Sequence, residues 1–178
     1  METKDLAALC RKPLESRDIP FELEVADVAP SVAARSLLLA DGAGRVQLLT
    51  GRDRYLDLFA LQSATGRELR ALRNDDAASV ARKLGLAELP GIPQVTGMPM
   101  WIDEALLNAQ HVYLPSGQDQ QWIRVDRSAF ARLIGDCKVI DCSRPALLDI
   151  LDQGDRKPVE EDRKSTRLNS SHLVISYA

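Results

Sequence analysis

Hydrophobic and polar positions recur along the chain with two spacings, and these spacings predict its helices and strands. Between Lys4 and Ser16 the apolar residues return about every 3.6 positions, which indicates a helix that Pro13 would bend or interrupt. Phe21–Val25 alternates between apolar and polar residues, as a half-buried strand does. The same reasoning predicts short strands at Glu68–Leu72, Met100–Ile102, His111–Leu114, Trp122–Val125 and Lys138–Ile140, and a helical turn at Glu104–Leu107.

The clearest local prediction is a β-hairpin. Two apolar runs, Ser36–Ala40 and Val46–Thr50, flank the turn Asp41–Gly44. An Asp-Gly turn between apolar runs favours a tight connection between antiparallel strands. Because both runs contain unbroken leucines, we expect both faces of the hairpin to be buried.

Three further helices are expected from their apolar faces and their start signals. Asp57–Thr65 should turn Leu58, Phe59 and Leu61 inward. The next helix should begin with Asn74 or Asp75 as its cap, and the last should follow a cap at Asp126. Their inward residues would be Ala77, Val80, Ala81 and Leu84 in one helix and Phe130, Leu133 and Ile134 in the other. Helices mixed with tightly connected strands predict an α+β fold with a mixed sheet.

The stretch Leu89–Glu104 combines three prolines and two glycines with a short apolar segment that ends in two acids. Proline fixes φ and glycine allows unusual backbone angles, so the sequence itself shapes this loop. Exposed amides in such a loop would be available to a ligand, and we interpret the stretch as the floor of a pocket. The alternative is a long turn between two elements.

Length and composition indicate one soluble domain with a tail. The chain has 178 residues and a net charge of −3. No apolar run approaches the ~20 residues of a membrane helix, and the N-terminus has no signal-peptide pattern, so a cytoplasmic location is expected. Net acidity argues against general affinity for nucleic acid. Eight basic residues against five acidic ones between Arg45 and Lys83 could still form a local patch for RNA, or a solvated face.

The sequence predicts no metal and no cofactor. Cys10, Cys137 and Cys142 form no even disulfide set and have no histidine at metal-ligand spacing. No glycine-rich nucleotide motif is present.

The last seventeen residues, Asp162–Ala178, back-translate without a gap into a short-read sequencing adapter, with Leu173 and Val174 encoded by its index bases. We interpret this tail as an artefact rather than a natural disordered tail. Without it the net charge is −5, since the tail holds three basic residues and one acid. The expected organisation is a domain at 1–141, a linker or the start of a next domain at 142–161 with a helix at Ala146–Leu151, and the tail at 162–178.

The order of several short segments resembles the YbaK/prolyl-tRNA synthetase-associated editing family. The segments are Arg35–Leu39, Tyr55–Leu58, Pro90–Pro93, Ile102–Leu107, Val112–Gly117 and Val125–Ser128. The resemblance implies a mostly antiparallel, barrel-like mixed sheet with flanking helices. It also implies an aminoacyl-tRNA deacylase that hydrolyses the ester of mischarged tRNA without a metal. Domains similar to this one also occur ahead of an HDOD-type regulatory domain, which suggests a longer protein.

The resemblance assigns roles to individual residues. Amides at Gly91 and Gly97 would stabilise the oxyanion, with Asp103 as the acidic residue of the strand-end motif. Substrate would be bound by Arg35, Ile92, Pro93 and Gly117. Arg35 stands where the family has lysine, and arginine keeps the charge but does not readily release a proton. The glycine/proline loop is also shorter than the family's.

Each of these residues also has a structural interpretation. Arg35 could be a surface charge, and Asp103 and Glu104 could cap the helical turn that follows them. His111 is more typical of a partly exposed strand residue than of a base, and Trp101 and Trp122 of packing residues than of a pocket lining. The functional alternative to the deacylase is a catalytically impaired module that senses tRNA or an amino acid within a regulatory protein. A purely structural interaction domain is a third possibility.

Overall fold

The computed structural model describes residues 5–27, 30 and 33–146. Its helices are α1 (Ala8–Ser16), α2 (Leu58–Thr65), α3 (Asn74–Lys83), the short 3₁₀ helix η1 (Glu104–Asn108) and α4 (Arg127–Ile134). Its strands are β1 (Glu22–Val25), β2 (Ala34–Asp41), β3 (Gly44–Gly51), β4 (Arg54–Leu56), β5 (Arg70–Ala71), β6 (Met100–Asp103), β7 (His111–Pro115), β8 (Gln121–Asp126), β9 (Lys138–Ile140) and β10 (Ser143–Pro145).

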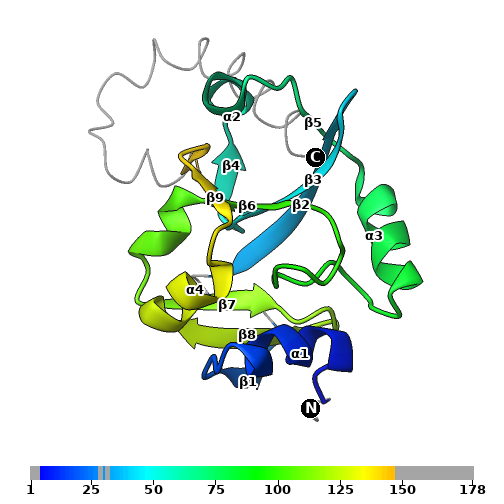
Figure 1. Cartoon of the computed structure of the whole chain (residues 1–178), viewed down its shortest axis with the longest axis vertical. Coiled ribbons are helices and arrows are strands. Elements are labelled where there is room, and N and C mark those ends of the chain that lie inside the picture. The colour runs from blue at the N-terminus through cyan, green and yellow to red at the C-terminus, as the bar shows by residue number, and fades with distance from the viewer. Residues whose placement is uncertain (1–4, 28–29, 31–32, 147–178) are drawn as a thin grey trace, which may run out of the picture.

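The long β2–β3 hairpin is the centre of the fold (Figure 1). It lies within a five-stranded sheet of order β5-β2-β3-β6-β9, in which β6 runs parallel to both β3 and β9. A second sheet, β1-β8-β7, is antiparallel, and β4 pairs with β10. The predicted α+β class with a mixed, mostly antiparallel sheet is confirmed.

Contact between β2 and β7 joins the two larger sheets. A parallel bridge pairs Ala33, just before β2, with Tyr113 of β7. The described strands therefore curve around a common interior, although they form three sheets rather than one closed barrel.

The hairpin forms as its sequence predicts, and Asp41 shapes its turn. The carboxylate accepts bonds from the N–H groups of Ala43 and Gly44 and from the guanidinium of Arg67. The bond from Arg67 is the main reason that the pKa of Asp41 falls to about 2. The interior of the hairpin is buried on both faces at Leu39, Leu48 and Leu49.

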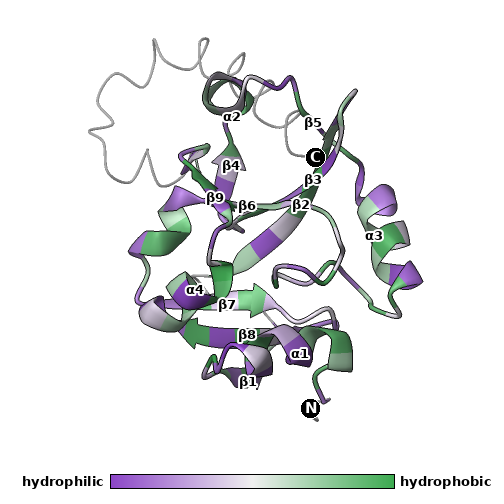
Figure 2. Ribbon diagram, in the orientation of Figure 1, coloured by the Kyte–Doolittle hydropathy of each residue, from purple (hydrophilic) through white to green (hydrophobic). Residues whose placement is uncertain are grey.

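Two groups of buried apolar side chains make the core. The larger group lies between α1, α4 and the strands β7 and β8, and includes Leu14, Ile92, Ile123 and Phe130. The smaller group lies under α2 and includes Leu61. Figure 2 shows hydrophobic and hydrophilic residues side by side on α1, α3 and α4, as expected for helices that bury one face.

The predicted helix starts are partly confirmed. Asp126 caps α4 by accepting a bond of 2.7 Å from the N–H of Ala129. The cap predicted for α3 is wrong, because this helix begins at Asn74 and its N-cap residue Arg73 makes no side-chain bond. The predicted interruption at Pro13 is also absent, since α1 continues through it.

The predicted inward face of α2 is wrong for two of its three residues. Leu61 is buried, but Phe59 is 80% exposed and Leu58 is 36% exposed. A helix of two turns that rests on the sheet buries only a narrow stripe, and Leu61 fills it.

Two short strands were not predicted. β4 comes just before the helix expected at Asp57–Thr65, and β10 lies within the segment assigned to a linker or the start of a next domain. Cys142 and Ser143 are buried, so the packed structure continues past Asp141. The predicted helix at Ala146–Leu151, apart from Ala146, and the tail at 162–178 lie outside the described residues. No helix in the described part of the chain has the length and apolar character needed to cross a membrane.

Candidate functional site

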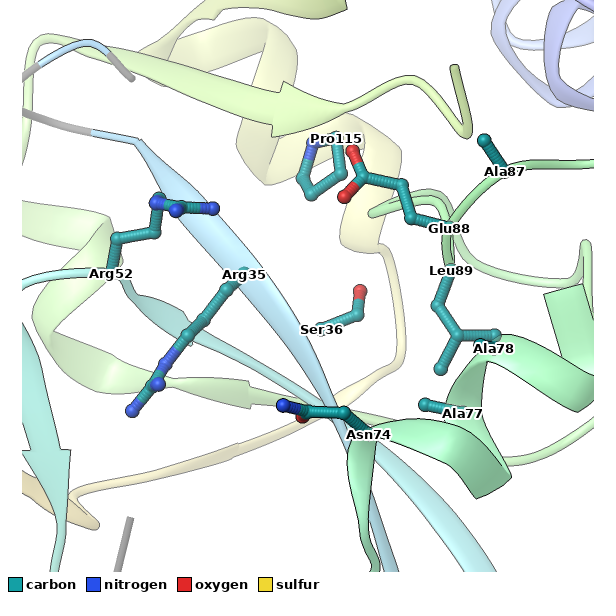
Figure 3. Close-up of a pocket in the computed structure, with 10 residues that line it drawn as sticks. All are labelled: Arg35, Ser36, Arg52, Asn74, Ala77, Ala78, Ala87, Glu88, Leu89 and Pro115. Carbon is teal, nitrogen blue, oxygen red and sulfur yellow. The ribbon is translucent and has the colours of Figure 1, made fainter. Parts of the chain in front are cut away.

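A hollow of about 410 Å³ opens beside Arg35, and we call it the Arg35 hollow (Figure 3). Its lining residues come from β2, from the turn after β3, from the start of α3, from the loop that follows α3 and from the end of β7. They are Arg35, Ser36, Arg52, Asn74, Ala77, Ala78, Ala87, Glu88, Leu89 and Pro115. The volume falls within the range of about 300–1,000 Å³ that is typical of small-molecule sites.

A buried glutamine on β3 holds the loop that begins at Leu89, which is the one residue of the stretch Leu89–Glu104 to line this hollow. The side-chain amide of Gln47 is fully buried and donates to the carbonyl of Pro90 at 2.7 Å and to the hydroxyl of Ser36 at 3.0 Å. Its oxygen accepts a bond of 3.0 Å from the hydroxyl of Thr96. Ser36 also donates to the carbonyl of Pro90. The loop therefore takes its shape from the strands as well as from its own prolines and glycines.

Gln47→Leu should destabilise the protein by about 2 kcal/mol. Leucine fills a similar volume, but the hydroxyl of Thr96 loses its acceptor and the carbonyl of Pro90 loses the donor amide of Gln47. Urea denaturation monitored by circular dichroism measures this. Gln62→Leu is the matched control, since Gln62 is exposed and should change stability by less than about 0.5 kcal/mol. Equal stability of the two variants would show that the network adds nothing.

The two arginines of the hollow are held differently. The guanidinium of Arg35 donates to the carbonyl of Arg54 at 3.2 Å, and Figure 3 shows this side chain running away from Glu88. The guanidinium of Arg52 lies over the ring of Trp122, 5.7 Å from its centroid, and makes no hydrogen bond or ion pair with any described residue. Arg52 thus has the cationic head that is most available to a ligand.

Glu88 brings a carboxylate to the opposite wall of the hollow (Figure 3). Its backbone is fixed because the N–H groups of Ala87 and Glu88 both donate to the carbonyl of Gly117, at 2.8 and 3.2 Å. Burial raises the pKa of Glu88, the charge of Arg52 lowers it, and the charge of Asp119 raises it. The carboxylate of Glu88 and the guanidinium of Arg52 therefore face the same hollow without forming an ion pair with each other.

Gly91 was predicted to offer its amide to an oxyanion, but in the structure this amide is already hydrogen-bonded to another residue. The N–H of Gly91 donates to the carbonyl of Pro115 at 2.9 Å. A Cβ at this position would lie 2.8 Å from Cδ of Pro115 and 3.1 Å from Cδ1 of Leu49, so glycine is required by the close approach of two chain segments. Ile92 beside it is completely buried in the core and does not line the Arg35 hollow.

Asp103, the predicted acidic site residue, is completely buried and does not line the Arg35 hollow. One carboxylate oxygen accepts bonds from the hydroxyls of Thr50 and Ser143, and the other accepts from the N–H of Ala105 at the start of η1. Its observed contacts join β3, β6 and β10 and cap η1. They match the structural alternative raised from the sequence.

The remaining predicted residues do not gather with Arg35. Gly97 and Pro93 line a second hollow of about 660 Å³ between the loop, β6 and the end of α4. Gly97 has a φ of +76° and open space where a Cβ would lie. Gly117, at φ +91°, is buried against Leu86 and contributes its carbonyl to the segment that carries Glu88. Of the predicted substrate-binding residues, only Arg35 lines the hollow itself.

The described residues hold no group of three or more His, Cys, Asp or Glu side chains placed to bind a metal ion. Cys10, Cys137 and Cys142 are all free thiols, and burial raises the pKa of Cys10 to about 11 and of Cys142 to about 12. His111 is a partly buried residue of β7, opposite Asp126 of β8, and does not line the Arg35 hollow.

Sequence reasoning missed Arg52, Asn74 and Glu88 as residues of one site. No local motif marks them, because they come from three separate segments that only the packing of α3 and its following loop against the hairpin brings together. The one available signal was position: Glu88 directly precedes the proline-glycine loop.

No known protein-family profile matches the chain, and no curated protein is similar to it. Solved structures do share its fold. A proposed signal transduction protein from Marinobacter aquaeolei VT8 superposes with a TM-score of 0.70 and 26% identity over 78% of this chain and 31% of that one. This chain therefore spans about a third of that protein.

Two further structures match along almost their whole length. A proposed trans-editing enzyme for prolyl tRNA synthetase has a TM-score of 0.62 and 19% identity, covering 79% of this chain and 99% of its own. The hypothetical protein APE2540 has a TM-score of 0.63 and 17% identity, covering 76% of this chain and 99% of its own. At these identities the likeness shows the fold alone, and it supports the YbaK-like fold expected from the sequence.

Proposed function

We propose that the Arg35 hollow binds the aminoacyl end of a charged tRNA. The observation that carries this proposal is the placing of an unpaired guanidinium, that of Arg52, and a carboxylate, that of Glu88, on facing walls of a hollow of small-molecule size. The likeness in fold to a proposed trans-editing enzyme agrees with it. An RNA end supplies the anion that Arg52 would bind, since guanidinium groups match phosphate oxygens in geometry as well as charge.

The remaining wall suits an apolar amino-acid side chain. Ala77 and Ala78 on α3 and Leu89 on the loop present short or apolar groups to the hollow. Such a wall favours an apolar side chain over a charged one, because it offers the charge no partner. Which amino acid fits best is a matter for a substrate panel.

Ester hydrolysis, the activity implied by the resemblance, needs donors directed at the developing oxyanion. The amide expected at Gly91 already donates to Pro115, and Asp103 is bound by two hydroxyls. These contacts favour the second candidate, a module that senses charged tRNA without hydrolysing it. In that version the domain works within a longer regulatory protein that carries an HDOD-type domain, and reading the gene past the codon for Glu161 tests this.

The expected cytoplasmic location stays a prediction.

The decisive experiment offers the protein a panel of charged tRNAs and measures both binding and release of the amino acid. Release above the uncatalysed rate identifies a deacylase. Binding without release identifies a sensor. Failure to bind any charged tRNA at low salt would contradict the proposal as a whole.

Arg52→Gln should weaken binding of charged tRNA about tenfold at low salt and reduce the salt dependence by about one counterion, because one phosphate contact is lost. Filter binding across a salt series measures both quantities. Arg132→Gln is the matched control, since Arg132 is exposed on α4 and does not line the hollow. An equal loss in the two variants would mean that Arg52 acts only through net charge.

A further inference from the structure

We propose that Glu88 recognises the free α-ammonium group of the amino acid carried by the tRNA, so that the site distinguishes a free amino terminus from a blocked one. The inference rests on the proposed function and adds a specificity to it. It follows from the position, the missing partner and the surroundings of this one carboxylate.

The Glu88 side chain is directed into the hollow from a fixed backbone. Two N–H groups, those of Ala87 and Glu88, are bound to the carbonyl of Gly117, and Gly117 itself is packed against Leu86. Figure 3 shows the carboxylate beside Pro115, facing the space toward Ser36 and Arg52. A ligand in the hollow would therefore meet this carboxylate in a defined place.

The carboxylate has no hydrogen bond or ion pair with any of the residues that the structure describes. Its charge is costly in this position, because burial removes water and the charge of Asp119 adds repulsion, whereas Arg52 offsets only part of this. A small cation that enters the hollow would compensate for the lost water by pairing with the carboxylate. The unpaired, partly buried charge of Glu88 would therefore be stabilised when a cationic ligand binds.

The chemistry of an aminoacyl ester matches this arrangement. It carries a primary ammonium one carbon from the ester carbonyl, with three donors for a carboxylate, and a phosphate at the far side of the ribose. With Arg52 on the wall opposite Glu88, a ligand with a cation at one end and an anion at the other satisfies both walls at once. N-acylation removes the cation and adds bulk at the position that Glu88 faces.

The test compares stable amide-linked aminoacyl RNA hairpins that end in CCA with twins whose α-amino group is acetylated. The full chain should bind the free form of at least one hairpin about tenfold or more tightly than its twin, as expected for loss of a charge-assisted hydrogen bond. Glu88→Gln should bind the two twins within about twofold of each other. Glu104→Gln, at an exposed position outside the hollow, should keep the discrimination of the wild type.

The outcomes separate this inference from the proposed function. If wild-type protein binds free and acetylated twins equally, or if Glu88→Gln still discriminates, the inference is wrong and tRNA binding stands. If hairpins with lysine or arginine bind more tightly than the others while their free and acetylated twins bind equally, Glu88 recognises a side-chain cation and the inference is wrong. If no hairpin binds, both proposals fail. The wild-type comparison needs no variant, and a melting curve shows whether Glu88→Gln is folded.

The pH dependence of this discrimination distinguishes direct recognition by Glu88 from a purely structural role, which would not produce it. Discrimination should fall as the pH is lowered through the raised pKa of Glu88, where the carboxylate gains a proton, and fall again above about pH 8, where the α-amino group loses its own. Arg52 and Asp119 are the other charged groups that act on this carboxylate, and Arg52 keeps its charge over this range. A discrimination that does not change with pH would overturn the assignment to Glu88.

Discussion

Gly91→Ala should lower the free energy of unfolding by about 3 kcal/mol, as overpacking of a buried position does. The added methyl group would lie 2.8 Å from Cδ of Pro115, 3.1 Å from Cδ1 of Leu49 and 3.2 Å from Cβ of Leu114. The Leu49 methyl group can shift, but the Pro115 ring and the Cβ of Leu114 are fixed by the backbone, so the loop must move away from β7. That movement also breaks the 2.9 Å bond from the N–H of Gly91 to Pro115. Chemical denaturation followed by circular dichroism gives the value.

Gly42→Ala is the control for this substitution. Gly42 lies in the hairpin turn, and no atom lies within 4 Å of the Cβ that alanine would add. Its stability should stay within about 0.5 kcal/mol of the wild type. If Gly91→Ala instead kept wild-type stability and lost only hydrolysis of charged tRNA, the amide would act on the substrate as the resemblance implies.

Asp103→Ala should cost about 3 kcal/mol of stability, because the hydroxyls of Thr50 and Ser143 and the N–H of Ala105 lose their common acceptor in a fully buried place. Asp103→Asn keeps one acceptor oxygen and should lose about half as much. The guanidinium of Arg54 also donates to Ser143, so β10 should loosen with either change. Urea denaturation measures the stability, and protection of the Ser143 amide from hydrogen exchange reports on β10.

Asp136→Ala, at an exposed position after α4, is the matched control and should be near neutral. A catalytic role for Asp103 predicts the opposite pattern. In that case Asp103→Asn would keep its stability and lose the release of amino acid from charged tRNA in proportion to folded protein.

Local sequence was sufficient wherever a residue acts on its immediate neighbours. Asp126 caps the helix that begins at the next residue, and the Asp-Gly turn closes a hairpin whose two strands are adjacent in the chain. These features depend on backbone groups within about four positions, so the pattern alone predicts them. Phe59 shows the limit even here, since helical periodicity does not say how much of a short helix the rest of the protein covers.

The candidate site was predictable only in part, because its members interact across long stretches of chain. Arg35 was identified through a resemblance and does line the hollow, whereas Gly91 and Asp103 proved to be held by contacts with Pro115 and Ser143. A glycine that exposes an amide and a glycine that admits a neighbouring strand look the same in sequence. The same is true of an acid that acts on substrate and one that binds two hydroxyls.

The sequence by itself therefore determined the elements, the hairpin and the mixed α+β class, since these follow from short-range periodicity and capping. Only the tertiary structure decided which charged groups share a hollow. Burial and pairing depend on distant segments: the loop after α3 places Glu88 opposite Arg52, and the same packing uses the Gly91 amide to hold the loop. The chemistry of the site depends on which polar groups already have a hydrogen-bond partner within the protein and which can still bind a ligand.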